Sequence, residues 1–301
     1  MTLINLTTTN SFFNNHYLNV MKKLTSIFLI VTFLTSCSEN QNSKQKIEAA
    51  EHTTEVLAFP KELIGEWVLA DYITSIEKTK STVKSANKLK GIVAIYVCGI
   101  PKTDTMEVGA NLNNHEGSSF RILLEKGTLP NSFKTDCMDF DCASNRYEIG
   151  IEKINNIEYL FMYLFNKSNK LIKKTKYSKI MQHCSENELA TGLEIVVNKN
   201  LIVGTYQLID STNKSTPITF KKNGTILGNS MLKNYYIFTD FIVGPMPEVD
   251  EIALNFRLPN QTNYLLKRKG NTLYLHETLG DGLPGGTAFK AGKIVYKLIK
   301  N

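Results

Sequence analysis

The chain has 301 residues, of which 35 are Lys or Arg and 28 are Asp or Glu, so its formal net charge is +7. This length allows one large domain or two of ordinary size. Basic and acidic residues alternate along the chain, and the one dense basic group, at 170–176, is typical of the solvent side of a strand. We therefore expect no nucleic-acid partner.

The first feature in chain order is a short apolar segment behind two lysines, Lys22 and Lys23. The run from Leu24 to Leu34 has 11 residues, whereas a helix that crosses a bilayer needs about 20. A basic start, a short apolar core and small residues after it are typical of an export signal. The 20 residues before Met21 contain no Lys or Arg. We interpret Met21 as the start of translation, with a genuine N-terminal extension as the alternative.

The signal ends in Leu34-Thr35-Ser36-Cys37, which resembles the lipobox of bacterial lipoproteins. The resemblance implies that residues 1–36 are absent from the mature protein and that Cys37 carries acyl chains such as palmitate. Two or three chains hold a protein at a membrane for long periods. An ordinary secretory signal with a chance cysteine is the alternative. Ser38 is compatible with sorting to the outer membrane, and its periplasmic face and the cell surface both remain open.

A polar stretch follows the lipobox, and strand patterns follow that stretch. Residues 37–60 contain few large apolar side chains, which predicts a flexible lipidated tether. We expect a first β domain at 61–184, a linker at 185–200 and a second β domain at 201–301. Outside the signal, only 75–89 shows a pattern that could form an amphipathic helix.

The strand patterns predict an all-β protein. The sequence GIVAIYVC at 91–98 is a buried apolar run, and Leu273 and Leu275 alternate with polar neighbours. Asn223-Gly224 lies between two strand-like segments, and both residues suit the positive φ angles of a type I′ turn. Many short strands joined by such turns favour a sandwich or barrel.

The chain also resembles itself. Segment 63–72 matches 201–210, and segment 147–175 matches 250–278, which suggests a duplication with extra residues in a loop-rich region at 100–146. Two unrelated β-meanders would look similar too.

Gly65-Glu66-Trp67 resembles the Gly-x-Trp signature of lipocalins and their calycin relatives, and Gly204-Thr205-Tyr206 is a second, degenerate example. The resemblance implies two tandem antiparallel barrels in which Trp67 and Tyr206 pack across one end. The family places an arginine from a late strand over this ring, whereas segment 293–300 offers only lysines.

Four cysteines remain after Cys37, and an even count in an exported chain predicts disulfides. We prefer the pairs Cys98–Cys184, which would join two strand ends, and Cys137–Cys142, which would close a tight polar loop. The alternative is a metal site formed by Cys137, Cys142, His183 and Cys184 with nearby aspartates. It lacks the paired spacings of structural zinc sites.

No catalytic or cofactor motif is recognisable. His115 and His276 fit a solvated loop and an outward strand position, and the glycine-rich segment 280–292 precedes a strand, not the helix that a phosphate loop needs. We expect a non-enzymatic envelope lipoprotein that binds a protein partner or a small apolar ligand, without a metal or cofactor. The alternatives are an inhibitor of an envelope-attacking hydrolase that plugs a cleft with a loop at 100–146, and a hydrolase that uses Asp139, Asp141 and Asp281.

Overall fold

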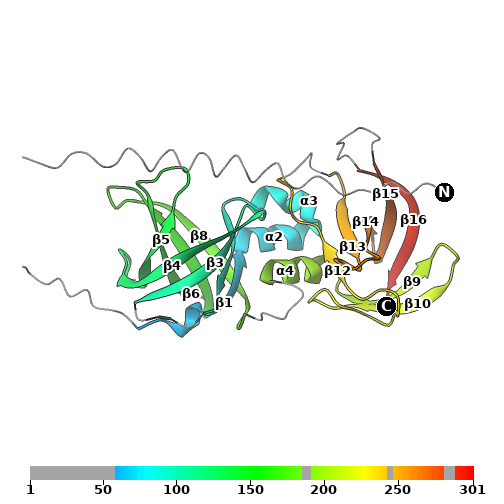
Figure 1. Cartoon of the computed structure of the whole chain (residues 1–301), viewed down its shortest axis with the longest axis horizontal. Helices are drawn as coiled ribbons and strands as arrows, with labels where there is room; N and C mark the ends of the chain where they lie inside the picture. The colour runs from blue at the N-terminus through cyan, green and yellow to red at the C-terminus, as the bar shows by residue number, and fades with distance from the viewer. Residues whose placement is uncertain (1–57, 100, 103, 185–190, 243–246, 281–288) are drawn as a thin grey trace, which may run out of the picture. The chain divides into compact units, whose positions relative to one another are not determined.

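The computed structural model describes residues 58–99, 101–102, 104–184, 191–242, 247–280 and 289–301 (Figure 1). The export signal, Cys37, nearly all of the predicted tether and Asp281 lie outside the described residues, as does most of the glycine-rich segment. The expectations for these segments therefore stay predictions.

The first half of the described chain is a closed barrel of eight antiparallel strands in sequence order. The first strand closes the ring, because Trp67 pairs with Ile95 on one side and with Lys179 on the other. The strands are β1 (Gly65–Leu69), β2 (Ile92–Val97), β3 (Thr105–Leu112), β4 (Glu116–Lys126), β5 (Ser132–Met138), β6 (Arg146–Ile154), β7 (Ile157–Phe165) and β8 (Leu171–Met181).

The second half is another antiparallel sheet of eight strands, in the order β11-β10-β9-β16-β15-β14-β13-β12. Within the described residues, no pairing of named strands joins its two edges, although Ile226 N donates to Lys233 O at 2.9 Å and Tyr235 N to Gly224 O at 2.8 Å. The strands are β9 (Gly204–Asp210), β10 (Ser215–Phe220), β11 (Ile226–Leu227), β12 (Tyr235–Ile237), β13 (Asp250–Leu254), β14 (Thr262–Lys269), β15 (Thr272–Gly280) and β16 (Phe289–Lys300).

The predicted all-β class is confirmed, and one of the two expected barrels is present. The region 100–146, expected to be rich in loops, instead contains β3, β4 and β5. The expectation failed because polar and apolar residues alternate there, for example in Thr105–Leu112, and such a strand has only one apolar face. What remains outside strands near its end is the short connection from Asp139 to Asn145 between β5 and β6.

Two helical segments accompany the sheets, one between β1 and β2 of the barrel and one between β8 and β9. After β1, helix α2 (Ala70–Thr79) ends at Lys80, whose φ of 49° is left-handed, and α3 (Thr82–Ser85) and the 3₁₀ turn η2 (Ala86–Lys88) follow. The predicted helix over 75–89 is therefore present in part and broken at Lys80. Helix α4 (Gly192–Leu201) occupies most of the segment predicted as a linker at 185–200.

Helix α4 forms because its start is capped and its face is apolar. Thr191 and Glu194 make a capping box, in which each side chain binds the backbone N–H of the other residue. Leu193, Val197 and Leu201 are nearly fully buried. The helix contacts β1 and β8 of the barrel and β12 of the second sheet. The segment predicted as a linker therefore contains a helix whose apolar side chains belong to the hydrophobic core.

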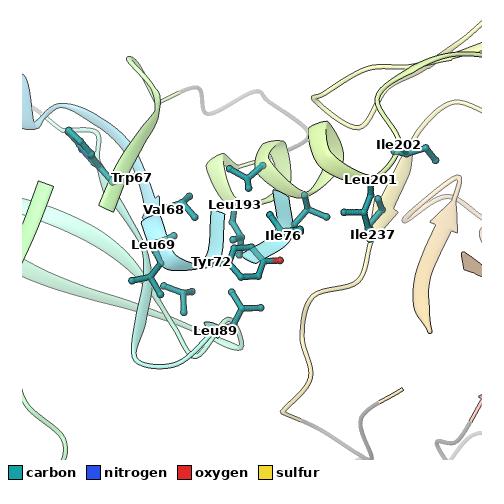
Figure 2. Packing of buried hydrophobic residues seen from close by; sticks show 14 of the residues in the cluster. Trp67, Val68, Leu69, Tyr72, Ile76, Leu89, Leu193, Leu201, Ile202 and Ile237 are labelled. Atoms are coloured by element: carbon teal, nitrogen blue, oxygen red, sulfur yellow. The ribbon is translucent and has the colours of Figure 1, made fainter. Parts of the chain in front are cut away.

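The two sheets share buried contacts through these helices. Tyr72 and Ile76 of α2 lie beside Leu193 and Leu201 of α4 and Ile237 of β12 in one hydrophobic cluster (Figure 2). Next to it, the Asp250 carboxylate of β13 accepts hydrogen bonds from the side chains of Ser81 and Thr82 and from the N–H of Val83. The division into domains that fold independently stays a prediction.

The proposed duplication can be compared with the strand order. Segments 63–72 and 201–210 both enter the first strand of a sheet, β1 and β9. Segment 147–175, however, covers the sixth to eighth strands of the barrel, whereas 250–278 covers the fifth to seventh strands of the second sheet. The second match is therefore displaced by one strand and does not locate an insertion.

Candidate functional site

The side chain of Trp67 is buried near the end of the barrel where the chain enters. A 3₁₀ turn, η1 (Lys61–Leu63), precedes β1, and the indole N–H of Trp67 donates to Leu63 O at 2.8 Å. Lys179 of β8 lies over the ring, with its Nζ 4.6 Å from the ring centroid, and donates to Glu62 O at 2.7 Å. Burial lowers the pKa of Lys179.

The second sheet has a related entrance. Tyr206 of β9 is almost fully buried, and its ring meets Phe220 edge-on at 5.9 Å between centroids. The guanidinium of Arg268, from β14, donates to the carbonyl oxygen of Leu201, the last residue of α4. Sequence reasoning missed Lys179 and Arg268, because only the strand register brings them to the helical turn that precedes each first strand.

Between its ends, the barrel interior is occupied by its own side chains. Alternate residues of each strand point inward, where the largest lie between 0% and 6% exposed. They come from all sides of the ring and include Trp67, Ile95, Met106, Val108, Phe120, Ile122, Ile149, Leu160, Met162 and Tyr177. The interior of the barrel is therefore a packed core.

The second sheet, by contrast, has a pocket at the end remote from α4. The pocket has a volume of about 340 Å³, within the range of small-ligand sites. Leu208, Leu254, Tyr264 and Tyr296 line it from four strands of the sheet. Its remaining lining is mostly polar and includes Asp210, Lys214, Thr216, Asn229, Asn255, Asn260 and Thr262.

Two tyrosines form the aromatic wall of this pocket. The rings of Tyr264 and Tyr296 meet at 72° with their centroids 5.7 Å apart. Burial, with help from the neighbouring Tyr296, raises the pKa of Tyr264 to about 12. Its hydroxyl is therefore neutral at physiological pH and can donate a hydrogen bond.

The polar side chains differ in how many of their hydrogen bonds are already made. Asn255 is 3% exposed and uses its amide to bind Lys233 N and Met231 O, so it holds the wall in place. One oxygen of Asp210 accepts from the hydroxyl and N–H of Thr212 and from the N–H of Lys214, and these bonds lower its pKa. Asn260 is exposed. The pocket offers amide, hydroxyl and carboxylate groups beside two aromatic faces.

Among the described residues, Asp139, His115 and His276 each have separate hydrogen-bond partners, whereas Asp281 lies outside the described part of the chain. Asp139 accepts from Asp141 N at 3.2 Å and from Asn145 Nδ2 at 2.7 Å, so it shapes its own loop. His115 pairs with Asp240 at 2.7 Å, and His276 contacts Gly292 O at 3.0 Å. In the part of the chain that the structure describes, no three His, Cys, Asp or Glu side chains are grouped so that they could hold a metal ion.

One predicted cysteine pair is present and the other is not. Cys98 and Cys184 form a disulfide after the ends of β2 and β8, with their Cα atoms 5.3 Å apart. Cys137 and Cys142 are free. The second pairing is wrong because Cys137 packs against the barrel core from β5, whereas Cys142 is exposed in the connection that follows. The alternative metal site is also contradicted, since Cys184 is already bonded.

Comparison with known proteins found no family model, no curated protein and no solved structure that matches the chain. Among the described residues, no helix has the length and apolar character needed to span a membrane.

Proposed function

We propose that the chain is a lipid-anchored protein of the bacterial cell envelope that binds a small neutral ligand without transforming it. The observation that carries the proposal is the pocket of about 340 Å³ in the second sheet, whose wall contains the paired rings of Tyr264 and Tyr296. A packed interior suits a scaffold, whereas a preformed pocket with aromatic walls and a few polar groups suits small-molecule recognition.

The lining of the pocket favours a polar ring compound such as a neutral mono- or disaccharide over the apolar ligand expected from the sequence. Tyr264 and Tyr296 offer flat faces that can cover the apolar side of a ring. Asn229, Asn260 and the hydroxyl of Thr216 can bind ring hydroxyls. Asp210 and Lys214 balance each other in charge, which disfavours a strongly charged ligand.

Ligand binding can be tested by saturation-transfer NMR with a panel of neutral saccharides. A saccharide that binds the purified chain should lose its signal in Tyr296→Leu and Asn260→Ala variants. Tyr274 lies on the same sheet but outside the pocket lining, so Tyr274→Leu is the matched control. Absence of any signal, or an equal loss in the control, would remove the ligand proposal.

The anchor rests on the lipobox-like sequence that ends at Cys37. Outer-membrane placement is based on Ser38 after the lipidated cysteine. The position of Lys179 over the ring of Trp67 supports the lipocalin-like interpretation of the barrel. Replacing Cys37 by Ser should abolish incorporation of labelled palmitate and leave an unprocessed or soluble form. Unchanged labelling would show that the acyl chains are attached elsewhere.

One observation favours a second function, inhibition of an envelope-attacking hydrolase. The last residue of β5, Met138, and Phe140 in the short connection to β6 are exposed apolar side chains, at 67% and 73% exposure. Exposed apolar residues at a loop are a common means of entering a partner's cleft. The function predicts that the chain slows a peptidoglycan hydrolase and that Phe140→Ser, but not Leu227→Ser, removes this effect.

A further inference from the structure

The hairpin between β6 and β7 carries an exposed apolar tip. Asn155 and Asn156 form its turn, with φ angles of 52° and 63°. The flanking residues Ile154 and Ile157 pair directly across the hairpin and are 41% and 57% exposed. Two large apolar side chains paired at one exposed turn form a small apolar surface that can contact a membrane or a partner.

The tip lies at the end of the barrel where the chain enters. Since neighbouring strands are antiparallel, the end of β6 at Ile154 lies at the same end of the barrel as the start of β1 at Gly65. A groove of about 700 Å³ is lined by Pro60 and Glu62 of the entering segment and by Lys153 and Glu158 beside the tip. A membrane anchor on the preceding chain would therefore be attached on the tip side of the barrel.

The outer face of β7 changes in character with distance from the tip. Alternate residues Ile157, Tyr159 and Phe161 share this face. The ammonium of Lys176 lies 4.6 Å from the centre of the Tyr159 ring, and that of Lys174 lies 4.2 Å from the centre of the Phe161 ring. Ile157 at the tip, followed by Tyr159 and Lys176, matches the order of hydrocarbon, interface and head groups in a bilayer, whereas Phe161 farther along is only 4% exposed.

The charges beside the tip are balanced. Lys153 Nζ lies 3.2 Å from a carboxylate oxygen of Glu158, and both flank the isoleucines in sequence. Attraction to anionic lipid therefore contributes little at the tip itself, and burial of the two isoleucines is the main driving force available.

The predicted tether is long enough for the tip to reach the membrane surface. Between Cys37 and Ala58 lie 20 residues, and a flexible chain of that length has a root-mean-square span of about 25 Å. An anchor at this distance keeps the barrel near the lipid surface at a high effective concentration. A weak contact can therefore set the orientation of the barrel.

We propose that the Ile154 and Ile157 tip inserts into the phospholipid surface to which Cys37 is anchored, so that the barrel stands with its entrance end on the membrane. The orientation rests on the proposed anchor, whereas insertion of the tip can be measured separately from it. The pocket lined by Tyr264 and Tyr296 then belongs to the second sheet, which follows the anchored barrel in the chain.

The test uses the full chain, processed in a lipoprotein-exporting bacterium and reconstituted into phosphatidylcholine–phosphatidylethanolamine vesicles with or without brominated acyl chains. Trp67 is 0% exposed and is the only native tryptophan, so it supplies a constant background. Ile157→Trp adds a reporter at the tip. Ile172→Trp is the matched control, because Ile172 is 53% exposed but lies near the start of β8, at the opposite end of the barrel.

We expect brominated lipid to quench the added tryptophan emission at least twofold in Ile157→Trp and to leave the emission of Ile172→Trp unchanged. Both results should be the same in 1 M salt, because burial of apolar side chains is the expected driving force. Ile154→Asp beside the reporter should return quenching to the control level. No quenching, or equal quenching at both sites, would overturn the proposal, as would a tip emission that shifts only when a second protein is added. Mass spectrometry of residue 37 reports on the anchor separately: acylation without quenching refutes only the tip, and quenching without acylation refutes only the anchor.

Discussion

The barrel and the second sheet have similar first strands but differ in how their edge strands pair. Each opens with a glycine at positive φ, Gly65 or Gly204, and a buried aromatic ring two residues later. In the barrel, β1 pairs with both β2 and β8. In the second sheet the edge strands β11 and β12 have only two and three residues. Short edges leave the strands free to diverge, and the pocket occurs in this sheet. The closed barrel has its groove of about 700 Å³ at the entrance end, whereas the pocket of the second sheet is lined from its own strands and has two tyrosines in its wall.

The sharpest test of the comparison is to add one methyl group at each entrance glycine. At Gly65, with φ of 131°, a Cβ would lie 2.3 Å from the backbone oxygen of Met181. At Gly204, with φ of 149°, the nearest atom is the flexible Lys300 Cε at 3.2 Å. We expect Gly65→Ala to cost roughly 3 kcal/mol or more and Gly204→Ala roughly 1–2 kcal/mol in urea unfolding. Equal losses would mean that both entrances are equally tight.

The next largest effect concerns the disulfide, which only the barrel contains. Cys98 and Cys184 are 86 residues apart in sequence, and their bond restricts the unfolded chain, which typically contributes ~2–4 kcal/mol. Reduction, or replacement of both cysteines by serine, should lower the free energy of unfolding by that amount. A Cys142→Ser variant controls for loss of a thiol. If reduction changed nothing, the bond would be irrelevant to closure of the ring.

Sequence patterns predicted those parts of the fold that depend on neighbouring residues. Alternation and turn residues identified the all-β class, and the positions of Cys98 and Cys184 after apolar runs suggested the correct pair. Helix α4 was missed because an apolar run such as Leu193–Val197 is compatible with a strand, a helix or a linker until its partners are known. Thr191 and Glu194, three residues apart, were the local signal that could have identified its start.

The candidate pocket could not be predicted in the same way. Tyr264 and Tyr296 are 32 residues apart in the printed sequence and meet only because β14 and β16 both flank β15. Lys179 and Arg268 likewise reach the helical turns through strand register. Such sites depend on pairing between distant strands, and a shift of one residue would reverse which face each side chain occupies.

The two remaining thiols should differ strongly in reactivity. Burial raises the pKa of Cys137 to about 12, and the nearby Asp136 and Asp139 act in the same direction. Hydrogen bonds from Ser144 lower the pKa of Cys142, which is exposed. Since the thiolate is the reactive form, iodoacetamide at pH 7.5 should label Cys142 at least tenfold faster. Cys137 should react only when the barrel unfolds, as peptide mass mapping would show. Equal rates would show that Cys137 is not protected by burial, and absence of both free thiols would show that the two cysteines are bonded to each other.

The smallest effect concerns the contact between the barrel and the second sheet at His115. His115 lies beyond the end of β3, and its Nδ1 is 2.7 Å from Asp240 Oδ2 in the second half. The hydrogen bond to Asp240 raises the pKa of His115, and the negative charges of Asp240 and Glu116 act in the same direction. The folded-state pKa is therefore above the unfolded value of about 6.5. The contact stabilises the fold fully below that pH and is lost as pH rises through the folded-state pKa.

Asp240→Asn should lower the melting temperature slightly at pH 5.5 and not at pH 9. Asp136→Asn breaks the pair with Arg121, which stays charged throughout, so its effect should be the same at both pH values. A pH-independent effect of Asp240→Asn would show that the imidazole is not protonated in this contact.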